Sequence, residues 1–223
     1  MPPLGGLGIN IMNRRELIRL VAVMTGGAVV GGELFLTGCK TGAKADAGFT
    51  ASNISLLDEV AETIIPATNT PGAKAAQVGE FMKVMVTDCY TEKQQSAFTA
   101  GISQLEEACK KMHSKGFMDC DAKQRHDLLV SLEKEAKDFN QKRDETDKPL
   151  REANDEANKK LAWKDHKEFE GSPSHYYTMM KQLTLLGFFS SKTGMTETLR
   201  HIPVPGKFDG AFPYAKGDKA WAE

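Results

Sequence analysis

Apolar residues recur at helical spacing through most of this chain, and they predict a series of amphipathic α-helices. The first is expected over residues 53–65, with Ser52 or Asn53 as its cap. Pro66 ends it, because proline has no backbone N–H to donate to the preceding turn of a helix. After a Pro/Gly-rich turn, the pattern predicts a second helix over residues 78–89.

Two further helices are marked by their starting residues. Thr91 and Gln94 have the spacing of a capping box, so a third helix is expected to follow Thr91 and to run to about His113. Gly116 is expected to stop it. Asp121 then opens a fourth helix, whose inward face is predicted to hold four apolar residues: Leu128, Leu129, Leu132 and Ala136.

Charged residues dominate residues 137–165, where apolar positions are scarce. We interpret this stretch as a solvated helical arm, with a partly disordered insertion as the alternative. Pro149 is expected to interrupt any helix there. Apolar and aromatic residues return at Ser174, and they predict a last helix.

The final segment combines prolines, glycines and aromatic residues, so it is expected to be non-helical but not disordered. The predicted fold class is therefore all-α, an irregular helical bundle that forms a single domain over residues 53–223. Exposed aromatic residues often anchor protein interfaces. Candidate partner-interface residues are Phe188, Phe208, Phe212, Tyr214 and Trp221, whereas Leu183, Leu186 and Phe189 are expected to close the chain's own core. For Phe212, Tyr214 and Trp221, a place in that core is the alternative.

The N-terminal residues have the order of an export signal. Arg14 and Arg15 precede a mild, glycine-diluted apolar run, which is typical of a twin-arginine signal for folded proteins. The run ends in Leu-Thr-Gly-Cys, which resembles a bacterial lipobox with Cys39 as the lipidation site. Residues 1–39 are thus predicted to be a lipoprotein signal peptide. A membrane-spanning anchor is the alternative, but charges and glycines interrupt the run.

A flexible tether is expected to follow over residues 40–52, which are rich in Gly, Ala and Lys. The signal predicts a lipid-anchored protein on the periplasmic side of the cell envelope. Lys40 is not an acidic retention residue, which favours the outer membrane. The chain has 29 Lys and Arg against 30 Asp and Glu, with signs interspersed, so its charge gives no support for nucleic-acid binding.

With Cys39 assigned to lipid, the remaining cysteines are Cys89, Cys109 and Cys120. Cys89 and Cys109 are expected to lie too far apart on neighbouring antiparallel helices to pair. Cys109 and Cys120 flank the turn at Gly116, so they are the candidate disulfide, with Cys89 a buried free thiol. The alternative is that all three are small core residues.

Motifs for chemistry are not evident in the sequence. The five histidines lack the spacing of a helical metal site, and no dinucleotide-binding glycine motif follows a strand. Asp58, Glu59 and Glu62 lie close together on the first helix, but such acidic clusters are usually solvated faces. We therefore expect no catalytic, cofactor-binding or metal site in this chain. A folded-export signal without a cofactor site suggests a chain that travels with a cofactor-bearing partner.

The sequence also resembles subunit 3, the small or gamma subunit, of gluconate 2-dehydrogenase. The ordered motifs that carry this resemblance are Leu57-Asp58-Glu59-Val60-Ala61-Glu62-Thr63-Ile64-Ile65-Pro66, Thr70-Pro71-Gly72-Ala73, Asp88-Cys89-Tyr90-Thr91-Glu92-Lys93-Gln94-Gln95, Leu183-Thr184-Leu185-Leu186-Gly187-Phe188-Phe189-Ser190-Ser191, Pro203-Val204-Pro205-Gly206 and Lys219-Ala220-Trp221-Ala222.

The resemblance implies a non-catalytic accessory subunit of a membrane-associated dehydrogenase of sugars or sugar acids. Its partner would be a flavoprotein large subunit that holds FAD, and a c-type cytochrome with haem would take the electrons. The small subunit would support export, maturation and anchoring of the flavoprotein. The long charged arm and the lipobox depart from the usual family pattern. A stand-alone envelope lipoprotein, or an enzyme whose site assembles from distant residues, are the alternatives.

Overall fold

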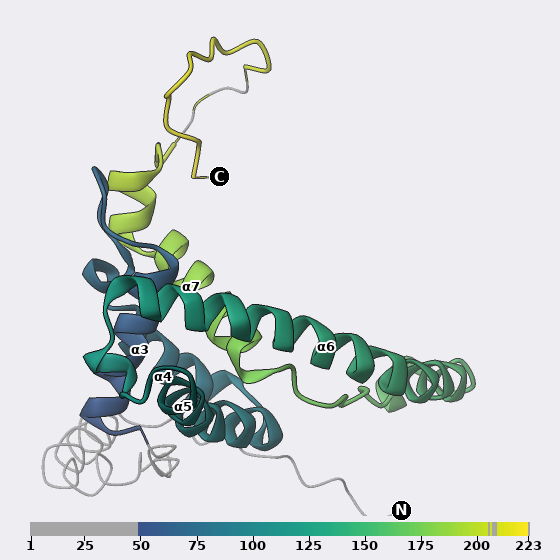
Figure 1. Cartoon of the computed structure of the whole chain (residues 1–223). Coiled ribbons are helices and arrows are strands. Elements are labelled where there is room, and N and C mark those ends of the chain that lie inside the picture. Colours follow the sequence, from purple (N-terminus) through teal and green to yellow (C-terminus); the bar gives the residue numbers. More distant parts are fainter. Residues whose placement is uncertain (1–48, 205, 207–208, 223) are drawn as a thin grey trace, which may run out of the picture. The chain divides into compact units, whose positions relative to one another are not determined.

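The computed structural model describes residues 49–204, 206 and 209–222. Within them the chain is all-α, which confirms the predicted fold class, and no strand is found among these described residues. The helices are α3 (Ala51–Ile64), α4 (Val78–Cys89), α5 (Glu92–His113), α6 (Ala122–Asn158) and α7 (Tyr176–Ser190), with short turns η1 (Ala73–Ala76), η2 (Phe117–Asp119), η3 (Trp163–Asp165) and η4 (Gly194–Thr198) (Figure 1).

Helix α7 is the centre of the bundle, because it packs against α3, α4, α5 and α6. Apolar side chains from all five helices form one core around it. The largest side chains with almost no exposure are Phe98, Phe117, Phe188, Leu57, Met82 and Leu105. Burial of such side chains is the main source of stability in a domain of this size.

Local capping residues set the helix starts. Thr91 forms the predicted capping box with Gln94, and Asp121, the predicted start of the next helix, forms a capping box with Gln124. Helix α3 begins earlier than expected, because the Thr50 side chain caps it by accepting a hydrogen bond from the Asn53 amide. Its start overlaps the end of the predicted tether over residues 40–52. Ser114, rather than Gly116, takes the left-handed conformation after α5.

The expected interruption at Pro149 is wrong, since α6 continues through it to Asn158. Figure 1 shows the second half of α6 extending past the other helices, with the segment that returns to α7 beside it. A face of polar side chains, spaced three or four residues apart, contacts that segment. Its members are Asn140, Arg143, Asp147, Arg151, Asn154 and Asn158.

Hydrogen bonds from this face lie on both sides of Pro149. Asp147 accepts from the Ser172 amide (2.7 Å) and hydroxyl (3.0 Å), and Asn158 binds both the amide and the carbonyl of Lys167. A Cβ at Gly171 would lie 2.7 Å from the Asp147 carboxylate, so the close approach requires glycine. These tertiary bonds offset the local loss of the proline N–H.

Replacing Asp147 with asparagine is expected to loosen the return segment. Asp147 is only 4% exposed, and the amide –NH2 would face one of the two Ser172 donors instead of accepting from it. We expect a loss of about 1–3 kcal/mol in unfolding free energy and faster hydrogen exchange over residues 166–175. Asp144→Asn is the matched control, because Asp144 is exposed and pairs with Arg143 on the same arm. Equal effects of the two changes would contradict this account.

Candidate partner-binding surface

The acidic residues of α3 are structural rather than a solvated face. Asp58 accepts a hydrogen bond from the Gly79 amide at the start of α4 (2.7 Å). Glu62 accepts from the amides of Ala67 and Lys74, both at 2.8 Å, and so fixes the turn between α3 and α4. Burial raises the pKa of the Asp58 carboxyl. These bonds explain the motif without assigning it a catalytic role.

Glu59, on the same helix, is the acceptor in an ion-pair network. It contacts Lys74 and lies 2.6 Å from Nη1 of Arg125. Hydrogen bonding to Lys74 lowers the pKa of Glu59, and Arg125 adds to this effect. Arg125 also donates to the carbonyls of Phe117 (3.1 Å) and Met118 (2.9 Å). The guanidinium therefore joins α3, η2 and α6.

The thiols of Cys109 and Cys120 lie side by side, with their sulfur atoms 3.4 Å apart. They are not bonded in the structure, and both are buried. Burial raises the pKa of Cys109 to about 12, and the hydrogen bond with Cys120 adds to it. The expectation of a buried Cys89 is wrong: Cys89 is exposed, because it is the last residue of α4 and lies outside the core.

The disulfide stays a prediction, which thiol counting tests. In exported protein, oxidation would transfer two electrons and two protons from Cys109 and Cys120 to a thiol oxidant of that compartment. We expect alkylation under denaturing, non-reducing conditions to modify Cys89 alone, and reduction beforehand to expose Cys109 and Cys120 as well. Cys120→Ser is the control, since it should leave Cys109 reactive without reduction. Full modification of the unreduced wild-type protein would contradict the bond.

The outer face of α7 differs from the expectation. Phe188, a candidate interface residue, has no exposure and belongs to the core, whereas Leu186 (51%) and Phe189 (41%) are exposed rather than buried. Leu183 is buried, as expected. Leu185 is also exposed, so the side chains of Leu185, Leu186 and Phe189 form an apolar patch at helical spacing. We call these three residues the α7 patch.

Two hydrogen bonds join the beginning and the end of the segment that follows η4. The Arg200 amide donates to the Ala220 carbonyl (2.8 Å), and the Ala222 amide donates to the Arg200 carbonyl (3.0 Å). The Arg200 guanidinium lies 4.7 Å from the centre of the Trp221 ring and 5.6 Å from that of Phe212. We call the described residues 200–204, 206 and 209–222 the C-terminal clasp.

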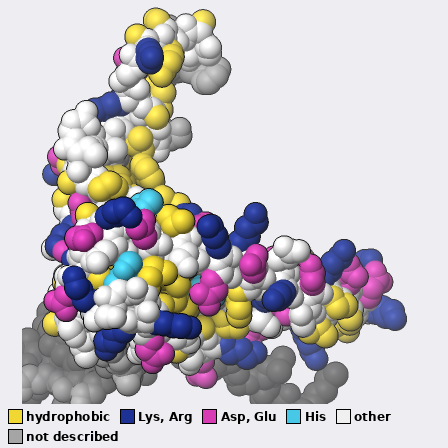
Figure 2. Space-filling model, in the orientation of Figure 1, with side chains coloured by type: hydrophobic (Ala, Val, Ile, Leu, Met, Phe, Trp, Pro, Cys, Tyr) yellow, Lys and Arg dark blue, Asp and Glu magenta, His cyan; other side chains and the backbone are white. Residues whose placement is uncertain are grey.

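The clasp exposes most of its apolar side chains. Phe212, Tyr214 and Trp221 are all exposed, although Arg200 holds two of the rings in place. Phe208 lies outside the described residues. Figure 2 shows hydrophobic side chains gathered along the C-terminal residues. Rigid aromatic side chains of this kind suit a protein interface, because little conformational entropy is lost when they bind.

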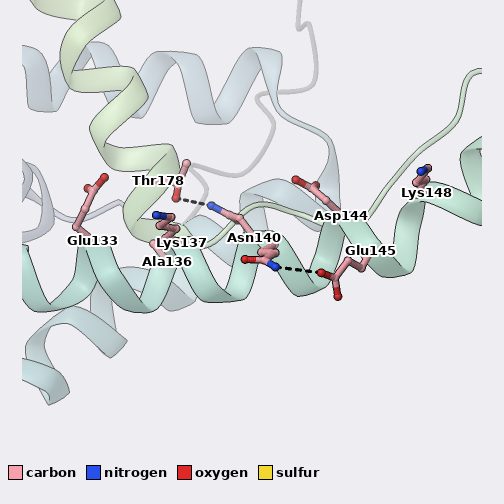
Figure 3. Close-up of a pocket in the computed structure, with 9 residues that line it drawn as sticks. Glu133, Ala136, Lys137, Asn140, Asp144, Glu145, Lys148 and Thr178 are labelled. Atoms are coloured by element: carbon pink, nitrogen blue, oxygen red, sulfur yellow. Dashed lines mark hydrogen bonds between the residues drawn. The ribbon is translucent and has the colours of Figure 1, made fainter.

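A shallow hollow lies on the flank of α6 near the start of α7 (Figure 3). Thr178 accepts a hydrogen bond from Asn140 there (2.8 Å), and Glu133 forms an ion pair with Lys181 (2.8 Å). The remaining lining is mostly charged side chains along one face of α6. Among the residues that line it, no nucleophile is paired with a base.

The predicted signal and lipidation residues fall outside the part of the chain that the structure describes. Arg14, Arg15 and Cys39 lie in residues 1–48, which are not described. Within the described part of the chain, no group of three or more His, Cys, Asp or Glu residues could hold a metal ion. Nor does any helix found there have the length and apolar character needed to cross a bilayer.

Comparison with known proteins identifies the family. The family model for gluconate 2-dehydrogenase subunit 3 matches residues 51–206, which cover the bundle, the arm and the start of the clasp. No curated protein and no solved structure matches the chain significantly. The family match spans well over half of the 223 residues. The chain therefore belongs to the gluconate 2-dehydrogenase subunit 3 family.

Proposed function

We propose that this chain is a non-catalytic accessory subunit of a membrane-associated, flavin-dependent dehydrogenase of sugars or sugar acids. The observation that carries the proposal is the family match over residues 51–206, since the family is named for one subunit of gluconate 2-dehydrogenase. Catalysis would belong to a flavoprotein partner that holds FAD. A c-type cytochrome would pass on the electrons.

The α7 patch is the proposed docking surface for the flavoprotein. Its three apolar side chains are exposed on the helix that the whole bundle positions, so their arrangement is rigid before binding. The C-terminal clasp adds exposed aromatic rings that Arg200 orients. Preorganised apolar and aromatic groups give interfaces most of their binding energy.

Export and anchoring are assigned to the N-terminal residues. Arg14 and Arg15 supply the twin-arginine signal, and a folded complex would cross the membrane with the partner attached to this chain. Cys39 would then carry the lipid that holds the complex on the periplasmic side of the envelope, at the outer membrane. One lipidated subunit would thus serve export, maturation and anchoring together.

The proposal is tested by purifying the tagged chain from its own cells in mild detergent. We expect a larger protein to co-purify and to show the absorbance spectrum of a flavin. A colourless chain, recovered alone from correctly exported material, would overturn the proposal. That outcome would favour the alternative, a stand-alone lipoprotein of the cell envelope.

A further inference from the structure

The tip of the α6 arm presents an aromatic side chain to solvent. Trp163 is 86% exposed, more than any other large hydrophobic side chain among the described residues. Leu161, two residues earlier, is also exposed. Neither contributes to the hydrophobic core of the bundle. An exposed tryptophan at the end of a helical arm is therefore a feature that the fold itself does not require.

The tip is ordered by contacts within the arm. The amide of Leu161 donates to the Asn158 carbonyl (3.0 Å), which continues the end of α6 into a turn. The rings of Trp163 and His166 lie 5.2 Å apart. Asn154 and Asn158 both donate to the Lys167 carbonyl, at 3.0 and 2.8 Å. Trp163 is thus presented on a fixed turn rather than on a free chain end.

Lysines lie on both sides of this tryptophan within the turn. Residues 159–167 contain four lysines and one acidic residue, Asp165, and all of these residues are exposed. Lys159 pairs with Glu156 (2.5 Å), which lies just outside this stretch. The four lysines are Lys159, Lys160, Lys164 and Lys167. Acidic residues flank the stretch at Glu156 and Glu168, so the excess of cations is confined to the turn itself, where Trp163 lies between Lys160 and Lys164.

These properties fit an anionic phospholipid surface better than a protein. A stable protein interface buries about 800 Å² on each partner, which one tryptophan and one leucine cannot supply. Binding to a lipid headgroup region requires less buried area, because the tryptophan ring inserts its apolar body while its N–H stays near water. Each lysine close to an anionic membrane adds about fivefold to the affinity.

We propose that the tip over residues 159–167 contacts an anionic bilayer, with Trp163 inserted at the headgroup level. If Cys39 carries a lipid, as the proposed function has it, the tip makes a second membrane contact. Two linked contacts bind more tightly than either alone, because the second forms at high effective concentration. The arm thereby orients the bundle, and with it the α7 patch, relative to the membrane.

Tryptophan fluorescence tests this directly, because the chain has two tryptophans. In the Trp221→Phe variant of the full chain, Trp163 is the sole reporter. With vesicles of phosphatidylglycerol and phosphatidylethanolamine, we expect its emission to shift to the blue and brominated lipid to quench it. Attachment through the N-terminal residues alone would leave Trp163 in water, so the signal reports on the tip itself.

The matched control is Trp163→Phe, in which Trp221 is the reporter and no shift is expected with vesicles. Lys160→Gln with Lys164→Gln should lower the affinity for vesicles, measured by titrating the Trp163 shift, about 25-fold, as two lysines at about fivefold each. An unchanged Trp163 spectrum at every vesicle concentration overturns the proposal. A shift that requires the co-purified flavoprotein and not lipid also overturns it, and assigns the tip to that protein. Neither result depends on whether the flavoprotein binds the α7 patch.

Discussion

Changing Leu186 and Phe189 together to aspartate is expected to abolish co-purification of the flavoprotein. Both side chains are exposed on the α7 patch, so the free chain should keep its fold and its thermal stability. In the complex, two carboxylates would be buried against an apolar surface without partners. We expect a loss of about 2–4 kcal/mol in binding free energy, or about thirtyfold to a thousandfold in affinity.

Val130→Asp is the matched control for this change. Val130 is exposed to a similar degree as Phe189, but it lies on α6, outside the patch. Flavin recovered in the pull-down should therefore stay at the wild-type level in this variant. If the double variant retained the flavin as well as the control does, the α7 patch would not be the docking surface.

Replacing Arg125 with methionine is expected to cost about 2–4 kcal/mol of unfolding free energy. Methionine keeps much of the apolar stem but removes the contacts with Glu59 and with the carbonyls of Phe117 and Met118. The contacts with Glu59 and Phe117 are partly buried, so water does not fully replace the lost partner there, whereas the Met118 carbonyl is exposed. Chemical denaturation of wild type and variant measures the difference.

Lys123→Met is the control, because the pair of Lys123 with Asp127 is exposed to solvent and should contribute little to stability. The pH dependence of the unfolding free energy gives a second check on the pair of Arg125 with Glu59. The pKa of Glu59 is lowered in the folded chain, so its contribution is present above the ordinary value of 4.5 and is lost as pH falls below it. The gap between wild type and Arg125→Met should therefore narrow in acid. A gap that widened there would contradict the role of Glu59.

Local signals predicted the helices well. Thr91 and Asp121 carry their capping partners within three residues, so the starts of α5 and α6 could be read from short stretches of sequence. The prediction of a break at Pro149 was wrong, because the effect of proline on the helix is local. The compensating hydrogen bonds come from Ser172 and Lys167, far along the chain. The recurrence of hydrogen-bonding residues at helical spacing along the arm was the signal that could have shown the contact.

The sequence could not show which face of α7 is buried, since the second half of this helix is apolar on nearly every side. The contact with α4 decides it. A Cβ at Gly187 would lie 2.6 Å from the Phe81 ring, so this face must turn inward, and it takes Phe188 with it. Leu186 and Phe189 are left outside. The acidic residues of α3 were misread for a similar reason, because their donors come from other elements.

The location of the flavoprotein in cells tests whether the present chain is its export escort. Periplasmic and cytoplasmic fractions would be assayed for protein-bound flavin of the co-purifying subunit, in wild type and in the Arg14→Lys, Arg15→Lys double variant. We expect this subunit to leave the cytoplasm only when the signal of the present chain is intact. A flavoprotein that reaches the periplasm equally well in the variant would contradict the escort role.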